Sequence, residues 1–172
     1  MRKLRYSVAV SLDGFIAGPN GEVDWIIIDP AIDFQSFFQQ FDTAVMGRSS
    51  YEVTSNLGGM MSGMSVIVCS RSMNPDDHAD ITITRDAEAT VRELKPTEGK
   101  DIWLFGGGNL FRNLLEAQLV DSIELAVIPV MLGNGVPLIT EGPLVPQLQL
   151  TESRALETGT LMLSYDIHYE PS

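Results

Sequence analysis

The chain has 172 residues, of which 11 are Lys or Arg and 23 are Asp or Glu, so its formal net charge is −12. A chain this acidic lacks the positive surface that binding to nucleic acid or to anionic membranes requires, and we expect neither partner. Its 44% hydrophobic and 20% charged residues are typical of a globular protein. We expect one domain over residues 1–172.

Single features exclude two further classes of protein, those held by internal disulfides and those that span a membrane. The one cysteine, Cys69, cannot form an internal disulfide, and because it lies in an apolar run we expect a buried, unreactive thiol. No apolar stretch approaches the roughly 18 residues that span a bilayer, and no signal peptide is recognisable. We therefore expect a cytoplasmic protein.

The first part of the chain predicts a strand, a turn and a helix. Residues 4–10 have the pattern of a strand, and residues 15–17 follow a break and run into a turn at residues 18–21. Asp33 then precedes aromatic residues at helical spacing. They predict an N-capped helix with one apolar face, made by Phe34, Phe37, Phe38 and Phe41.

Strands and helices continue to alternate up to residue 121. Apolar runs predict buried strands at residues 43–46, 65–69, 81–83 and 102–105. Between and after them, helices are expected at residues 51–55, 87–94 and 109–118. This alternation predicts right-handed crossovers and a largely parallel sheet.

The last third of the chain is rich in strands. Residues 123–130, 148–154 and 161–169 have strand patterns, and residues 157–160 have the composition of a hairpin turn. Such a segment adds antiparallel strands at the edge of the sheet. The predicted fold class is α/β, with a mixed, mostly parallel central sheet flanked by helices and antiparallel C-terminal strands.

The most informative motif is a run of three glycines at residues 106–108, between a predicted strand and a predicted helix. Glycine lets the backbone approach a ligand closely, and the N-terminus of the following helix offers N–H groups to an anion such as phosphate. Glycine also occurs in such turns for steric reasons alone. A Rossmann fingerprint is excluded, because Phe111 occupies the last glycine position of that pattern.

Two other strand ends carry residues suited to phosphate. Glycine, arginine and serine follow the predicted strands there, as Gly47, Arg48, Ser49 and Ser50 after one and Ser70 and Arg71 after the other. Arginine binds phosphate through paired hydrogen bonds, although either arginine alone could be a solvated or ion-paired surface side chain. Because ligands of parallel sheets bind outside the carboxyl ends of the strands, the three turns predict one elongated, polyanionic ligand.

Four motifs occur in an order and spacing that is typical of one family. They are residues 11–17 (Ser-Leu-Asp-Gly-Phe-Ile-Ala), Met-Gly-Arg with Tyr-Glu at 46–52, Phe-Gly-Gly-Gly at 105–108 and residues 129–135 (Pro-Val-Met-Leu-Gly-Asn-Gly). With them the chain resembles the dihydrofolate-reductase-like superfamily. It is most similar to the reductase domain of bacterial bifunctional riboflavin biosynthesis enzymes and its stand-alone relatives.

The resemblance implies a dihydrofolate-reductase-like three-layer fold around an eight-stranded sheet, a homodimer, and NADPH as the cofactor. By position, Val8, Ala9 and Ile16 would border the nicotinamide. The phosphates, including the 2′-phosphate that separates NADPH from NADH, would be held by Gly47, Arg48, Ser49 and Ser50, and by Ser70 and Arg71. The pyrophosphate would lie over Gly106, Gly107, Gly108, Asn109 and Leu110, with a cis peptide bond between the first two.

The resemblance implies fewer residues for the substrate than for the cofactor. In folate-reducing members an acid near the start of the first helix holds the pterin ring, and the matching catalytic residue here is Asp33. Asp33 could equally be a helix N-cap, and Asp29 or Asp24 could take the substrate role. The homodimer expectation also rests on the apolar strands predicted at residues 123–130 and 161–163.

The resemblance implies an NADPH-dependent reductase of a small, pyrimidine- or pterin-like heterocycle, most like 5-amino-6-(5-phosphoribosylamino)uracil reductase of riboflavin biosynthesis. That substrate carries a phosphorylated sugar, so its site needs cations beyond those that hold NADPH. Two alternatives remain open: a dihydrofolate or pteridine reductase, and a non-catalytic nucleotide-binding protein with the same fold. The sequence shows no cluster of metal ligands.

Overall fold

The computed structural model describes residues 1–56, 61, 63–143 and 146–169. Its strands are β1 (Leu4–Ser11), β2 (Phe15–Ala17), β3 (Phe41–Gly47), β4 (Ser65–Cys69), β5 (Thr82–Thr84), β6 (Asp101–Gly106), β7 (Ser122–Ile128), β8 (Val136–Pro137), β9 (Gln147–Ala155) and β10 (Leu161–His168). Its helices are α1 (Phe34–Phe38), α2 (Arg48–Asn56), α3 (Ala87–Leu94) and α4 (Gly108–Glu116), with a 3₁₀ turn η1 at Pro75–Asp77.

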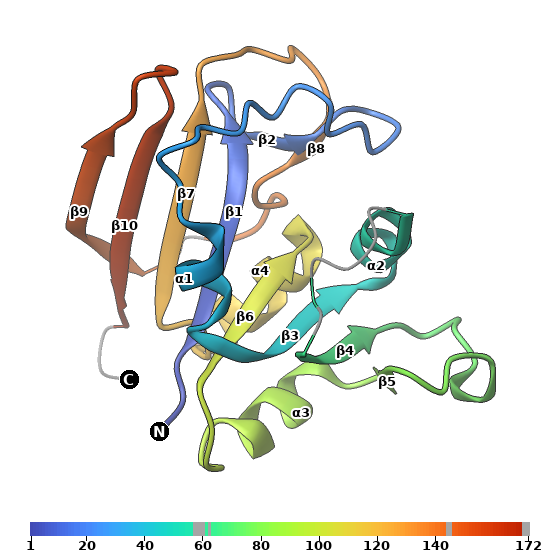
Figure 1. The fold of residues 1–172 in the computed structure, drawn as a ribbon. Helices are drawn as coiled ribbons and strands as arrows, with labels where there is room; N and C mark the ends of the chain where they lie inside the picture. The colour runs from blue at the N-terminus through green and yellow to red at the C-terminus, as the bar shows by residue number, and fades with distance from the viewer. Residues whose placement is uncertain (57–60, 62, 144–145, 170–172) are drawn as a thin grey trace.

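Eight strands form one sheet in the order β5-β4-β3-β6-β1-β7-β10-β9 (Figure 1). The neighbours from β5 to β7 pair in parallel, whereas β10 pairs antiparallel with both β7 and β9. The predicted α/β class, with a mostly parallel sheet and antiparallel C-terminal strands, is therefore confirmed. β2 and β8 form a separate two-stranded sheet, in which β8 was not predicted.

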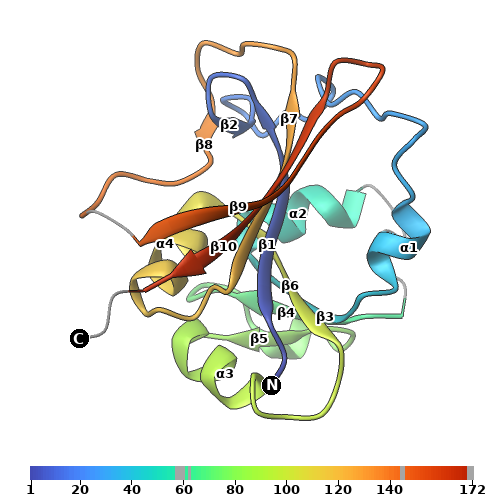
Figure 2. The same cartoon turned by 90° about the vertical axis from the view of Figure 1, so that its left-hand side faces the viewer.

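The helices lie on both faces of the sheet. Figures 1 and 2 show α1 over one face and α3 and α4 over the other. Side chains of a strand alternate between the two faces, so Leu4 and Tyr6 of β1 point toward α4, and Arg5 and Ser7 point toward α1. This alternation decides which residues of the central strands reach each side.

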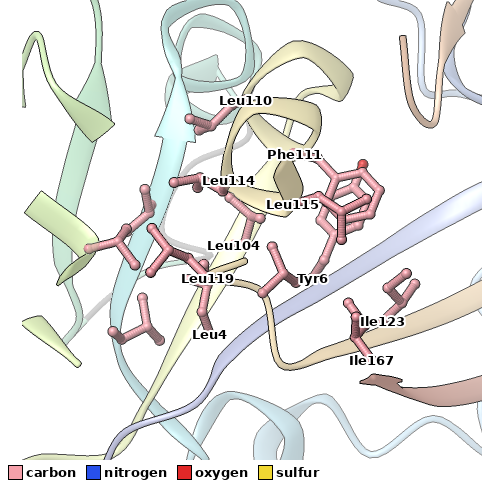
Figure 3. Close-up of a cluster of buried hydrophobic side chains, with 14 of the residues drawn as sticks. Leu4, Tyr6, Leu104, Leu110, Phe111, Leu114, Leu115, Leu119, Ile123 and Ile167 are labelled. Carbon is pink, nitrogen blue, oxygen red and sulfur yellow. The ribbon is translucent and has the colours of Figure 1, made fainter. Parts of the chain in front are cut away.

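The main core lies between the sheet and α4 (Figure 3). Leu4 and Tyr6 from β1 are fully buried there with Leu104 from β6 and Leu114 from α4. The ring of Tyr6 stacks on Phe111 of α4 with 3.9 Å between the ring centroids, an arrangement that stabilises the packing beyond the area it buries. This core fixes α4 beneath the end of β6.

A second, aromatic cluster lies on the α1 face. Its buried members include Phe41, Met46 and Trp103, and Phe37 and Phe38 of α1 pack against them. The Phe37 and Trp103 rings meet edge to face with their centroids 5.4 Å apart.

The helix predicted after Asp33 is shorter than expected. It ends at Phe38, and Phe41 begins β3 instead of extending the apolar helix face. Phe41 is only 3% exposed and stacks on Trp103, so its ring is buried from a strand position. The prediction that Phe41 belongs to the helix was wrong because burial on the sheet outweighed the local helical spacing.

The C-terminal hairpin agrees with the prediction. β9 and β10 pair antiparallel from Leu161↔Ala155 to His168↔Gln147, and Gly159 in the connecting turn has φ +85°. β9 forms one edge of the sheet, and all of its residues are exposed.

Candidate active site

A cleft of about 2260 Å³ extends from the carboxyl ends of β3, β4 and β6 to the face of the sheet beneath α1. The predicted cofactor residues, apart from Gly106, all line it, namely Val8, Ala9, Ile16, Gly47, Arg48, Ser49, Ser50, Ser70, Arg71, Gly107, Gly108, Asn109 and Leu110. Gly106 is buried and directly precedes this lining. The folded chain thus brings together residues that are spread over a hundred positions of sequence.

The three predicted strand ends converge because β4, β3 and β6 are neighbours in the sheet. Gly47 is the register partner of Cys69, and Met46 is the partner of Gly106. A Cβ at Gly47 would lie 3.9 Å from the Gly106 oxygen. The backbones of two of the turns therefore approach closely, side by side.

The glycine turn at residues 106–108 contains the cis peptide bond that the resemblance implied. The peptide bond between Gly106 and Gly107 is cis, and Gly106 has φ +129°, a region that other residues rarely adopt. Gly107 is the N-cap of α4 and uses no side chain to cap the helix. The first N–H groups of α4 consequently lie at the cleft with the positive end of the helix dipole.

Arg48 is the first residue of α2 and is held on two sides. Its Nε lies 3.0 Å from Oε1 of Glu52, and its Nη1 donates a 2.8 Å hydrogen bond to Oγ of Ser72. The side chain remains 50% exposed. These contacts orient the guanidinium beside the turn after β4 without burying it.

Ser70 shapes the turn after β4. Its buried hydroxyl accepts hydrogen bonds from the backbone N–H groups of Ser72 at 3.3 Å and Met73 at 3.1 Å. Arg71 is exposed and lines the cleft. Arg85, directly after β5, lines it as well. The sequence did not assign Arg85 to a site, although Arg85 follows a predicted strand in the same manner as Arg71.

The part of the cleft beneath α1 contains an acid that the sequence analysis missed. Glu124 of β7 is paired in register with Ser7 of β1 and with Ser164 of β10, so these three polar residues share one row on the same face. All three line the cleft. Oε2 of Glu124 accepts a 2.8 Å hydrogen bond from the Ser7 hydroxyl, and Oε1 accepts a 2.7 Å bond from Nε of Arg5.

Small and aromatic residues surround this polar row. Ala9 and Ala126, which are register partners, form the next row along the same face and leave space above the sheet. Phe37, Phe38 and Trp103 line the cleft beside them. Phe37 and Phe38 of α1 therefore belong both to the aromatic cluster and to the wall of the cleft.

The three candidate acids of the sequence analysis do not line the cleft. Asp33 is exposed and caps α1, accepting hydrogen bonds from the Ser36 N–H at 3.0 Å and the Ser36 hydroxyl at 2.6 Å, which lower its pKa. The N-cap reading of Asp33 is thus observed, and its catalytic role stays a prediction.

Asp29 and Asp24 differ in burial. Asp24 is exposed, whereas Asp29 is 1% exposed and accepts hydrogen bonds from the Ala31 N–H and from Thr158. These hydrogen bonds, that of Ala31 first, lower the pKa of Asp29. Asp29 therefore ties the loop before α1 to the turn between β9 and β10.

Among the described residues, no three His, Cys, Asp or Glu side chains are grouped as metal ligands. Over that same part of the chain, no helix has both the length and the apolar character needed to cross a bilayer.

Known proteins are similar to this chain in sequence or in fold. The sequence is 34% identical to YyaP of Bacillus subtilis over 95% of this chain and 94% of that one. A crystal structure of a "Putative riboflavin biosynthesis protein" from Shewanella sp. PV-4 superposes with a TM-score of 0.82 at 22% identity, covering 98% of this chain and all of that one. A "pyrimidine reductase-like protein" from Corynebacterium diphtheriae has a TM-score of 0.71 at 14% identity, over 98% and 93% of the two chains.

Residues 2–162 match the family described as the RibD C-terminal domain. This match covers nearly the whole chain and agrees with the resemblance drawn from the glycine and arginine motifs. The protein belongs to the RibD C-terminal domain family.

Proposed function

We propose that this protein is an NADPH-dependent reductase of a pyrimidine- or pterin-like heterocycle. The observation that carries the proposal is the convergence of three strand ends, with their glycine turns and with Arg48 and Arg71, on one cleft. Membership of the RibD C-terminal domain family and the names of the two similar structures support a reductase of this class.

The residues of the cleft suit a dinucleotide with several phosphates. Gly47 and Gly107 have no side chain to fill the space beside the two turns. The N-terminus of α4 suits a pyrophosphate, because its free N–H groups favour anions. Arg48 and Arg71, with Arg85 beside them, would hold the 2′-phosphate through charge-assisted hydrogen bonds.

The nicotinamide end would lie against β1. Val8, Ala9 and Ile16 of β2 line the cleft there, and the Val8 side chain packs against the main core. The apolar side chains of Ala9 and Ile16 would exclude water from one side of the ring. A bound NADPH supplies a hydride, and a proton from solvent completes the two-electron reduction of the substrate.

The direct test is turnover. Purified protein is mixed with NADPH and a panel of pyrimidines and pterins, including 5-amino-6-ribosylaminouracil, its 5′-phosphate and dihydrofolate, and cofactor oxidation is followed by absorbance. Reduction of a pyrimidine would support the proposal, whereas preference for dihydrofolate would favour the folate alternative. Tight NADPH binding with no oxidation across the panel would point to a non-catalytic nucleotide-binding protein.

We also propose a homodimer, formed through β9. All residues of this edge strand are exposed, with Leu148 at 48% and Leu150 at 52%. An exposed edge with apolar side chains favours pairing with another strand. β7, on which the sequence expectation partly rested, is an interior strand and offers no free edge. A monomeric sedimentation profile at micromolar concentration would contradict the dimer. The cytoplasmic location stays a prediction.

A further inference from the structure

We propose that Glu124 binds the N–H donor edge of the substrate, and that the substrate is a planar, amino-substituted heterocycle without a phosphate group. The inference rests on the proposed function, because it assigns the part of the cleft beside the nicotinamide end. It concerns a residue of β7 that none of the sequence motifs includes.

The carboxylate of Glu124 is positioned but not saturated. Each of its oxygens accepts one described hydrogen bond, from Arg5 on one side and Ser7 on the other, and its side chain is 21% exposed at the cleft. A carboxylate can accept about four hydrogen bonds. Acceptor capacity therefore remains for a ligand, and the two existing bonds hold the group in place for it.

Arg5 does not neutralise this part of the cleft. Its guanidinium also lies 3.3 Å from Asp101, donates to Gln40 and lies over the ring of Phe41. Two carboxylates thus share one guanidinium, which leaves a net negative charge. Groups that donate hydrogen bonds are favoured beside Glu124, and anions are repelled.

The cations of the cleft are all at its other end. Among the described residues that line it, the basic ones are Arg48, Arg71, Arg85 and Arg92, which follow β3, β4 and β5 or lie on α3. The lining residues from β1, β7, β10 and α1 include no lysine or arginine. A phosphorylated sugar would therefore find no basic side chain among the described residues that line this end of the cleft.

The shape of this region selects a flat ring. Ala9 and Ala126 form a low floor next to Glu124, and Phe37, Phe38 and Trp103 form an aromatic wall. Aromatic side chains stack on planar heterocycles. An aminopyrimidine or aminopterin would place its faces against these residues and its N–H edge toward the carboxylate.

The first experiment compares ligands on the unaltered protein by isothermal titration calorimetry with NADPH at saturation. The probes are 2,4-diaminopyrimidine and 2,4-bis(dimethylamino)pyrimidine, which lacks the N–H donors, and cytidine with cytidine 5′-monophosphate. We expect the diamino compound to bind about 10-fold or more tightly than its methylated analogue, and cytidine to bind more tightly than its phosphate. Equal binding within the first pair, or tighter binding of the phosphate, would overturn the inference.

The second experiment uses Glu124→Gln, with Glu93→Gln as the matched control because Glu93 is exposed on α3 and does not line the cleft. We expect Glu124→Gln to weaken 2,4-diaminopyrimidine roughly 10-fold to 100-fold, with NADPH affinity unchanged and no effect of the control. Unchanged affinity in Glu124→Gln would overturn the assignment. If this variant does not fold, the ligand comparison on the unaltered protein is by itself the test of the role assigned to Glu124.

Different results would contradict the proposed function and the role assigned to Glu124. Loss of NADPH binding by the unaltered protein would remove the proposed cofactor, and the same ligand pairs would then be titrated against the cofactor-free protein. If the protein binds and oxidises NADPH but prefers phosphorylated pyrimidines, that result would support the proposed function and contradict the role assigned to Glu124.

Discussion

The Ser7 hydroxyl donates a 2.8 Å hydrogen bond to the carboxylate of Glu124, across two parallel strands whose residues are 117 positions apart in sequence. This pair marks the acidic end of a cleft whose other end carries Arg48, Arg71 and Arg85. The described basic residues that line the cleft all lie at that end, where Asp86 and Glu88 line it as well. The arginines suit a polyphosphorylated cofactor, and Glu124 suits the N–H donors of a heterocycle.

Gly108→Ala should lower stability, because a Cβ there would lie 2.6 Å from the Pro137 oxygen and 3.3 Å from the Leu138 oxygen. Both are backbone atoms that cannot move cheaply, so we expect a loss of about 1–3 kcal/mol in the free energy of unfolding by urea. Gly47→Ala is the control, since its Cβ would make only ordinary contacts. Equal stability of Gly108→Ala and the unaltered protein would contradict this packing.

The parts of the site that could be predicted from the sequence are those formed by residues close together in the chain. The strand, glycine and helix-start pattern at Gly47 and at Gly107 is contained within a few residues, so the sequence was sufficient to find it. Glu124 was missed because its contact with Ser7 exists only after β1 and β7 pair. Asp29 likewise bonds to Thr158, 129 residues away, and no periodicity within either segment indicates that contact.

The Asp13 carboxylate holds the loop after β1 to the loop after β7. It accepts hydrogen bonds from the Ser11 hydroxyl, the Gly133 N–H and the Leu132 N–H, and these bonds, that of Ser11 first, lower its pKa from 3.8 to about 2. Because the folded pKa is below the ordinary value, the stabilisation is complete above pH 3.8 and is lost as pH falls toward 2.

Asp13→Asn should therefore melt at a lower temperature than the unaltered protein at neutral pH, and the difference should shrink as pH falls from 3.8 toward 2. Differential scanning calorimetry over this range provides the measurement. A constant difference at every pH would show that ionisation of Asp13 does not contribute.

The two roles of Asp33 can be separated by measuring stability and turnover together. Since its carboxylate caps α1 through Ser36, Asp33→Ala should lower the melting temperature. Asp33→Asn retains a capping side chain and should restore most of the stability. The catalytic role predicted from the sequence requires that turnover per folded molecule falls in both variants, and unchanged turnover would leave Asp33 with the N-cap role alone.

Cys69 should be an unreactive thiol at neutral pH. The side chain is half-buried, not fully buried as the sequence predicted, and it lines the cleft. This burial raises the pKa of the thiol to about 11, and only the thiolate is an effective nucleophile. We expect slow alkylation by iodoacetamide, with a rate that rises steadily up to about pH 11. Rapid alkylation of the folded protein at neutral pH would contradict the raised pKa of this thiol.

The central claim is that the arginine end of the cleft holds the 2′-phosphate of NADPH. Fluorescence titration of the unaltered protein and of Arg48→Ala with NADPH and NADH tests it most directly. We predict that Arg48→Ala loses about 1.5–3 kcal/mol of NADPH binding, roughly 10-fold to 150-fold in Kd, and that NADH binding is nearly unchanged. Equal losses for both cofactors, or no NADPH binding by the unaltered protein, would contradict the account.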